Sequence, residues 1–385
     1  MTVEGAEALS TAARAGRLAC FCPPGVAVAR DGEPSAPLRL AAGFALAVLS
    51  QTLVLGLLPL AGLLVAPDRK LATLPYVAML AGAAVATFPA SVLLDTFGRR
   101  AAFALGASHG VAGGLMMGFA LASHGFIAFC LGAFWLGIAQ GFGLFYRHEA
   151  AIGADVRSRS VAIAQVFGAG ALAGFAAPLI AVFADRRFGV PFVGTAIAAA
   201  VVQVGVLTLA MLSSRRAEAR SRQPRRDEQR TGHGIRTLIA PTLTAAAAWF
   251  GMTAMMLRTP FAMVGCGIGT GGIIGAIAWH VVAMYAPAPL VVPLTRLIGA
   301  GKVALAGLAL ILAASVLAGA AATETDFAGI LVLIAIGWSL ATAAATLALH
   351  EAGSLSRPLL ACHDAVLFGA AIAGALTAGG HLAFS

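Results

Sequence analysis

The chain has 385 residues, of which 60% are hydrophobic and only 11% carry a charge, and its mean hydropathy is +0.92. This composition excludes a soluble globular domain and indicates a polytopic membrane protein. The net charge of +9 does not indicate nucleic-acid binding, because the arginines lie in short loops between apolar runs. The five cysteines have no zinc-ligand spacing; they are Cys20, Cys22, Cys130, Cys266 and Cys362.

Eleven apolar segments are each long enough to cross a bilayer as a helix, which predicts an all-α membrane protein. They cover residues 38–64, 74–94, 101–122, 125–145, 160–183, 189–212, 237–258, 271–293, 301–320, 327–348 and 359–381. We expect four regions: a cytoplasmic tail over 1–36, a six-helix half over 37–212, an arginine-rich cytoplasmic linker over 213–236, and a second half of about five helices over 237–385.

The positive charges predict how the chain is oriented in the membrane. If the N-terminus is cytoplasmic, 20 of the 25 lysines and arginines fall on the cytoplasmic side. Because short cytoplasmic loops carry an excess of Lys and Arg, this distribution favours a cytoplasmic N-terminus. The first 36 residues contain no apolar run of the kind that a secretory signal needs.

The two halves carry similar sequences in matching loops. His148-Glu149 follows the fourth apolar segment, and His350-Glu351 follows the tenth, 202 residues later. This offset indicates a duplicated six-helix unit, an arrangement found in major facilitator transporters. Since the chain ends after the eleventh segment, we expect a twelfth span to be absent or merged with another segment.

The loop after the second segment reads LDTFGRR over residues 94–100 and resembles the major facilitator loop signature, with Thr96 in place of the usual basic residue. Asp95 falls where the helix meets the cytoplasm, and Gly98 permits a tight turn. Arg99 and Arg100 can pair with acidic side chains of neighbouring helices. We expect this loop to act as a gate that breaks and reforms during transport, as well as a topology signal.

Residues 249–287 carry the side chains that soft Cu(I) prefers. Met252 and Met256 are spaced i, i+4, as are His280 and Met284, so each pair shares one helix face. Cys266 lies in the glycine-rich turn between the two pairs, and thioether, imidazole and thiol are soft or borderline metal ligands. The alternative is structural, because methionine fills space in apolar helices and a lone histidine is often held by a hydrogen bond.

This pattern resembles the CcoA-like group of bacterial major facilitator copper importers, in which an MxxxM pair on the seventh span and an HxxxM pair on the eighth are the proposed ligands. The resemblance implies that copper is the cargo and crosses the inner membrane toward haem–copper oxidase assembly. Riboflavin transporters look similar to the same group. An importer of a small organic molecule is therefore an alternative, with Phe250, Trp279 and Tyr285 stacking on a flat ring. A third alternative is a non-transporting membrane protein that holds a partner.

Acidic residues are scarce in the apolar segments and fall near their predicted cytoplasmic ends: Asp95, Glu149, Asp155, Glu351 and Asp364. No carboxylate in the middle of a span is therefore available to carry a proton. The sequence also lacks a GxxxxGK[ST] loop, which excludes this mode of ATP binding. No catalytic triad or carboxylate pair is evident, so we expect a transporter without a cofactor and not an enzyme.

Overall fold

The computed structural model describes residues 36–154, 158–213, 236–351 and 355–382. The tail predicted over 1–36 and the linker predicted over 213–236 lie almost entirely outside these residues. The described residues belong to one compact unit, residues 35–385. Their secondary structure is helical throughout, as the apolar runs predict, because in a bilayer a helix satisfies every backbone hydrogen bond within its own segment.

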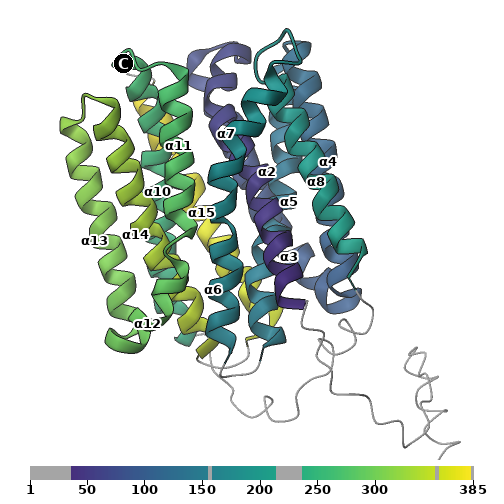
Figure 1. Cartoon of the computed structure of the whole chain (residues 1–385), viewed down its shortest axis with the longest axis vertical. Coiled ribbons are helices and arrows are strands. Elements are labelled where there is room, and N and C mark those ends of the chain that lie inside the picture. The colour runs from purple at the N-terminus through teal and green to yellow at the C-terminus, as the bar shows by residue number, and fades with distance from the viewer. Residues whose placement is uncertain (1–35, 155–157, 214–235, 352–354, 383–385) are drawn as a thin grey trace, which may run out of the picture. The chain divides into compact units, whose positions relative to one another are not determined.

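The described residues before 214 form seven α-helices, which we call the N-terminal group (Figure 1). They are α2 (Ala36–Val65), α3 (Leu74–Thr96), α4 (Gly98–Ala122), α5 (Phe126–Gly153), α6 (Arg159–Ala169), α7 (Ala171–Asp185) and α8 (Val193–Met211), with a short 3-10 helix η1 (Arg69–Leu71) between α2 and α3.

Between residues 236 and 382, the described part of the chain forms six α-helices, which we call the C-terminal group. They are α10 (Arg236–Gly265), α11 (Thr270–Tyr285), α12 (Ala288–Ile298), α13 (Ala300–Leu317), α14 (Glu324–Glu351) and α15 (Arg357–Leu382), with a 3-10 helix η3 (Ala318–Ala320) after α13.

The described residues contain ten helical spans that are long and apolar enough to cross a membrane, or eleven when α11 and α12 are counted as one bent span. Each of the eleven predicted segments falls on one of these spans. The structure differs from the prediction within 271–293, where one straight helix was expected. α11 ends at Tyr285, and α12 begins at Ala288 with a bend of 43° between them. Pro287 at this break has no backbone N–H to donate, which accounts for the interruption.

Close helix packing depends on small residues at the contacts. A Cβ atom added to Gly137 of α5 would lie 1.9 Å from the backbone oxygen of Met79 in α3. The backbones of α3 and α5 therefore approach more closely than any larger residue would permit. These two helices have the most extensive contact in the molecule.

The two groups pack against each other along several helix pairs. α3 contacts α15, α7 contacts α11, α6 contacts α12, and α2 contacts α11. In Figure 1 the purple-to-teal helices of the N-terminal group lie beside the green-to-yellow helices of the C-terminal group. α2 and α14 are the two most buried spans, and the side chains considered below lie on and around them.

Candidate functional site

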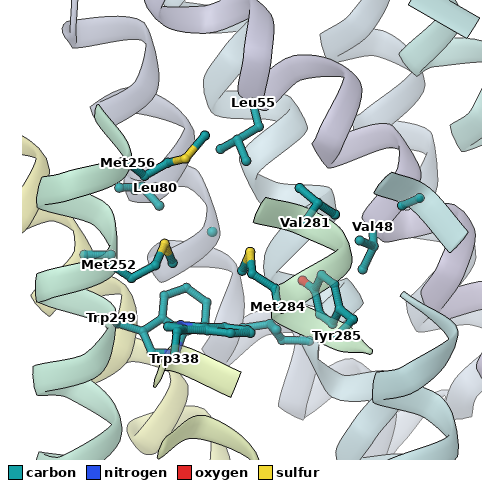
Figure 2. Close-up of a cluster of buried hydrophobic side chains, with 14 of the residues drawn as sticks. Val48, Leu55, Leu80, Trp249, Met252, Met256, Val281, Met284, Tyr285 and Trp338 are labelled. Atoms are coloured by element: carbon teal, nitrogen blue, oxygen red, sulfur yellow. The ribbon is translucent and has the colours of Figure 1, made fainter. Parts of the chain in front are cut away.

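The three predicted methionine ligands are buried together in the structure. Met252 and Met256 of α10 and Met284 of α11 are each at most 6% exposed. Figure 2 shows the side chains of Met252 and Met284 directed into the same space between their helices, with Met256 one turn further along α10, near Leu55 of α2. The i, i+4 spacing therefore places these thioethers on faces that meet inside the protein.

His280 is fully buried on α11, and its orientation is set by α14. Its Nδ1 donates a hydrogen bond to the backbone oxygen of Leu331 at 2.8 Å. Because Nδ1 carries the proton, Nε2 is left as an acceptor, and it has no hydrogen-bond partner among the described residues. His280 is thus held structurally, as the alternative interpretation expected, while one ring nitrogen stays available.

Cys266 does not lie with the methionines. It is exposed and follows the last residue of α10, ten residues beyond Met256, which is about 15 Å along a helix axis. Among the residues that the structure describes, no group of three or more His, Cys, Asp or Glu side chains is placed to hold a metal ion.

A group of six buried rings lies next to Met252 and Met284, and we call it the aromatic cluster. Its members come from six different helices of both groups: Phe44, Phe167, Trp249, Tyr285, Trp338 and Phe368. Ring centroids are 5.7 Å apart for Phe44 and Tyr285, and 5.4 Å apart for Trp249 and Trp338. These separations are typical of favourable aromatic pairs.

The two indoles of the aromatic cluster have spare hydrogen-bonding capacity. Trp249 and Trp338 are at least 95% and 98% buried, and neither Nε1–H has a partner within the described part of the chain. Figure 2 places both rings beside Met252 and Met284. Buried indole N–H groups usually find an acceptor, so the cluster offers both flat apolar surface and unpaired donors.

Two of the aromatic residues expected to stack on a cargo lie elsewhere. Phe250 is 40% exposed and Trp279 is 58% exposed, so both face outward from the helices. Only Tyr285 of that predicted set belongs to the aromatic cluster. Trp249 is the one that shares a helix face with Met252, because the two are spaced i, i+3. That spacing was the signal in the sequence that could have identified it.

Charged residues of both groups meet at the end of the helices that carries the 94–100 loop. Glu149 of α5 is fully buried and accepts hydrogen bonds from Arg99 and, at 2.7 Å, from Nε of Arg357. Arg357 of α15 also donates to Asp95 at 2.6 Å. Gly98 has a φ of +84°, a conformation that favours glycine, and this turn places Arg99 beside α5.

A second set of buried charges lies deeper. Arg147 of α5 pairs with Asp364 of α15, whose other oxygen lies 3.3 Å from Nε2 of His148. Nδ1 of His148 is 3.0 Å from Nε2 of His350, so the two histidines of the internal repeat are in contact. We call these eight residues the ion-pair network: Asp95, Arg99, Arg147, His148, Glu149, His350, Arg357 and Asp364.

The ion-pair network joins the N-terminal group to the C-terminal group, since α3, α4 and α5 belong to the first and α14 and α15 to the second. Removing one member leaves a buried charge without its partner, which is costly. The two groups cannot separate at this end without breaking these contacts. A role for the 94–100 loop as a gate stays a prediction.

A cleft lies toward the opposite end, between α2, α7, α8 and α11. It is mostly apolar, with Thr52, Asp185 and Thr195 as its polar side chains. Asp185 is occupied by Thr195, which donates to it from both its backbone N–H and its hydroxyl. Ile277 of α11 lines this cleft one turn before Val281, a neighbour of Met284.

Together, membrane-spanning helices in two groups, a cleft at one end and a charge network at the other define a membrane transporter. No family model matches the chain. The chain is 30% identical over 308 residues to the riboflavin transporter RfnT of Brucella anthropi. The aligned region covers 78% of this chain and 77% of that protein. The chain belongs to the major facilitator superfamily; it is a secondary transporter and not an enzyme.

Solved structures agree on the fold. The xylose transporter XylE of E. coli superposes with a TM-score of 0.68 at 13% identity, covering 90% of this chain and 92% of that one. The human organic anion transporter MFSD10 gives a TM-score of 0.66 at 14% identity, covering 90% and 93%. The Brucella anthropi relative is a riboflavin transporter, and these comparisons do not support copper as a cargo.

Proposed function

We propose that this protein imports a small, flat organic molecule of the riboflavin type across the bacterial inner membrane. The observation that carries this proposal is the 30% identity to a riboflavin transporter over about three quarters of both chains. The aromatic cluster supports it, because the flat isoalloxazine ring of riboflavin can stack on Trp and Tyr side chains, and its carbonyl oxygens can accept hydrogen bonds from the unpaired indole N–H groups.

Transport would proceed by alternating access, with the halves over 37–212 and 237–385 rocking about the aromatic cluster. Cargo would enter through the cleft between α7 and α11 and reach the aromatic cluster. The ion-pair network would then separate and open the cytoplasmic end. In the predicted orientation, with the N-terminus in the cytoplasm, this direction is import.

Uptake of radiolabelled riboflavin by a riboflavin-auxotrophic bacterium tests the proposal with a matched pair of tryptophans. Trp338→Ala removes a buried ring of the aromatic cluster, whereas Trp279→Ala removes an exposed ring on α11. We expect the first variant to lose most uptake and the second to keep it, with both present in the membrane at equal levels. Uptake that is unchanged by Trp338→Ala would remove the aromatic cluster from the proposal.

Copper is the second candidate, favoured by one observation: three thioethers are buried on α10 and α11, and His280, one turn from Met284, is buried with an unpaired Nε2 among the described residues. Such a soft ligand set suits Cu(I). The same methionines also pack within the hydrophobic core, where methionine fills irregular space. The double variant Met252→Leu/Met284→Leu separates the two cargoes. If copper is carried, this variant should abolish copper uptake. If riboflavin is carried, riboflavin uptake should stay within about threefold of the wild-type rate, because the apolar volume is conserved.

A further inference from the structure

Arg147 has hydrogen-bonding capacity that the protein does not use. Its side chain is fully buried near the end of α5, and its Nη2 donates to Asp364. Its Nε and Nη1 are also buried but have no partner among the described residues. A guanidinium presents its N–H donors in a rigid, planar fork, and leaving buried donors unpaired is costly. These two N–H groups are therefore placed for a partner that is not part of the chain.

The position of Arg147 identifies where that partner lies. The guanidinium carbon is 5.7 Å from the centroid of the Phe167 ring. Phe167 belongs to the aromatic cluster, with its ring centroid 6.2 Å from that of Tyr285 and 6.4 Å from that of Trp338. Arg147 thus connects the aromatic cluster to the other members of the ion-pair network. It lies at the edge of the surface proposed to hold a flat ring.

The charge balance around Arg147 limits the kind of partner. Asp364 already supplies one negative charge to the one positive charge of Arg147, and both side chains are fully buried. An additional anion would add a buried charge without a matching cation, which is costly. A neutral group with adjacent acceptor atoms can accept hydrogen bonds from one edge of the guanidinium without this cost.

We propose that Arg147 is a cargo-binding residue that recognises a neutral flat heterocycle by a carbonyl oxygen and a neighbouring ring nitrogen. This inference rests on the proposed function. Riboflavin carries two such acceptor pairs on its ring edge, the 4-carbonyl with N5 and the 2-carbonyl with N1. Nη2 carries two hydrogens and gives one of them to Asp364. The other, together with the neighbouring free Nε–H or Nη1–H, forms the planar fork that donates to one pair, while the ring packs on the aromatic cluster. A flavin phosphate, which brings two negative charges, fits this site poorly.

Arg147 also connects cargo to the ion-pair network. Its ion-pair partner, Asp364, belongs to α15, and an oxygen of Asp364 lies 3.3 Å from Nε2 of His148. The other ring nitrogen of His148, Nδ1, lies 3.0 Å from Nε2 of His350 on α14. Cargo bound to Arg147 therefore acts on the residue that holds α5 against α15. This places cargo recognition next to the contacts that must separate for release.

Binding measured with the purified full-length protein tests the assignment, using the quenching of flavin fluorescence as the signal. The probes are riboflavin, 5-deazariboflavin, 1-deazariboflavin and flavin mononucleotide. For the wild type we expect one of the two deaza compounds to bind at least about tenfold more weakly than riboflavin, because it lacks one acceptor of the recognised pair. We expect flavin mononucleotide to bind more weakly as well.

Two variants are needed because Arg147→Gln alone would leave the buried carboxylate of Asp364 without its arginine. Arg147→Gln/Asp364→Asn removes both charges, and we expect riboflavin binding about tenfold weaker or worse, with no difference left between riboflavin and the deaza compounds. Arg147→Lys keeps the charge but loses the planar fork, and it decides the question if the double variant does not fold. Arg296→Gln is the matched control, since Arg296 is an exposed arginine on α12.

The outcomes separate the two proposals. Wild-type protein that fails to bind riboflavin would contradict the proposed function, and this inference with it. Wild-type protein that binds riboflavin, with equal affinity in a folded Arg147→Gln/Asp364→Asn or Arg147→Lys variant, would overturn the assignment of Arg147 alone.

Discussion

Substitution of Glu149 tests the ion-pair network most directly, because this one buried carboxylate binds arginines from both helix groups. Its side chain is fully buried, while those of Arg99 and Arg357 are 13% and 10% exposed. Breaking a fully buried ion pair by removing one partner costs about 3–5 kcal/mol. Here the arginines are partly solvated and Arg357 keeps Asp95, so we expect Glu149→Gln to cost the closed conformation about 2 kcal/mol.

A cost of about 2 kcal/mol shifts the balance between closed and open conformations about 30-fold. Double electron–electron resonance measures the distance between nitroxide labels at Phe97 and Leu297, and the distance distribution reports this balance. Both side chains are exposed, one between α3 and α4 and the other on α12. In a variant that lacks the native cysteines, we expect Glu149→Gln to add a population with a longer distance between the labels.

The matched control for this experiment is Glu351→Gln. Glu351 occupies the equivalent position of the internal repeat but is exposed, so its substitution should leave the distance distribution unchanged. If folded Glu149→Gln protein gave the wild-type distance distribution, the network would not hold the closed conformation and the reasoning would be refuted.

Two further predictions concern packing and orientation. Gly137→Ala places a Cβ 1.9 Å from a backbone oxygen of α3, so we expect it to destabilise the protein by about 2 kcal/mol or more, whereas Gly329→Ala meets no atom within 4 Å and should leave the thermal midpoint in detergent nearly unchanged. Equal midpoints would show that α3 and α5 adjust freely. Cys266 is exposed at the end of α10 that lies outside in the predicted orientation, so a membrane-impermeant maleimide should label it in intact cells when the other four cysteines are replaced. Labelling only after lysis would reverse the orientation.

The helical architecture was predictable because it depends on local properties of the sequence. Each predicted apolar segment corresponds to a helical span, since length and hydropathy alone decide whether a segment can cross a bilayer. The bend between α11 and α12 was missed, although Pro287 marks it. His148 and His350 occupy equivalent positions of the internal repeat, and the structure shows that these two side chains, one from each helix group, are in contact.

The site was less predictable because it depends on contacts between distant parts of the chain. The sequence indicated that Asp364 lies near a helix end, but it could not show that Arg147, 217 residues earlier, would be buried against it. Likewise, Trp249 and Trp338 lie on different helices, and only the fold brings their rings together. The methionine spacing predicted that each pair shares one helix face, but spacing alone does not identify a cargo.

The central claim is that this transporter carries a riboflavin-type molecule, and uptake into proteoliposomes tests it most directly. Purified protein is reconstituted into vesicles, and entry of radiolabelled riboflavin is measured in parallel with entry of copper supplied as Cu(I). The account predicts riboflavin uptake that saturates, that unlabelled riboflavin suppresses, and that Trp338→Ala reduces while Trp279→Ala does not. Saturable copper uptake without riboflavin uptake would contradict it and return the buried methionines to the role of metal ligands.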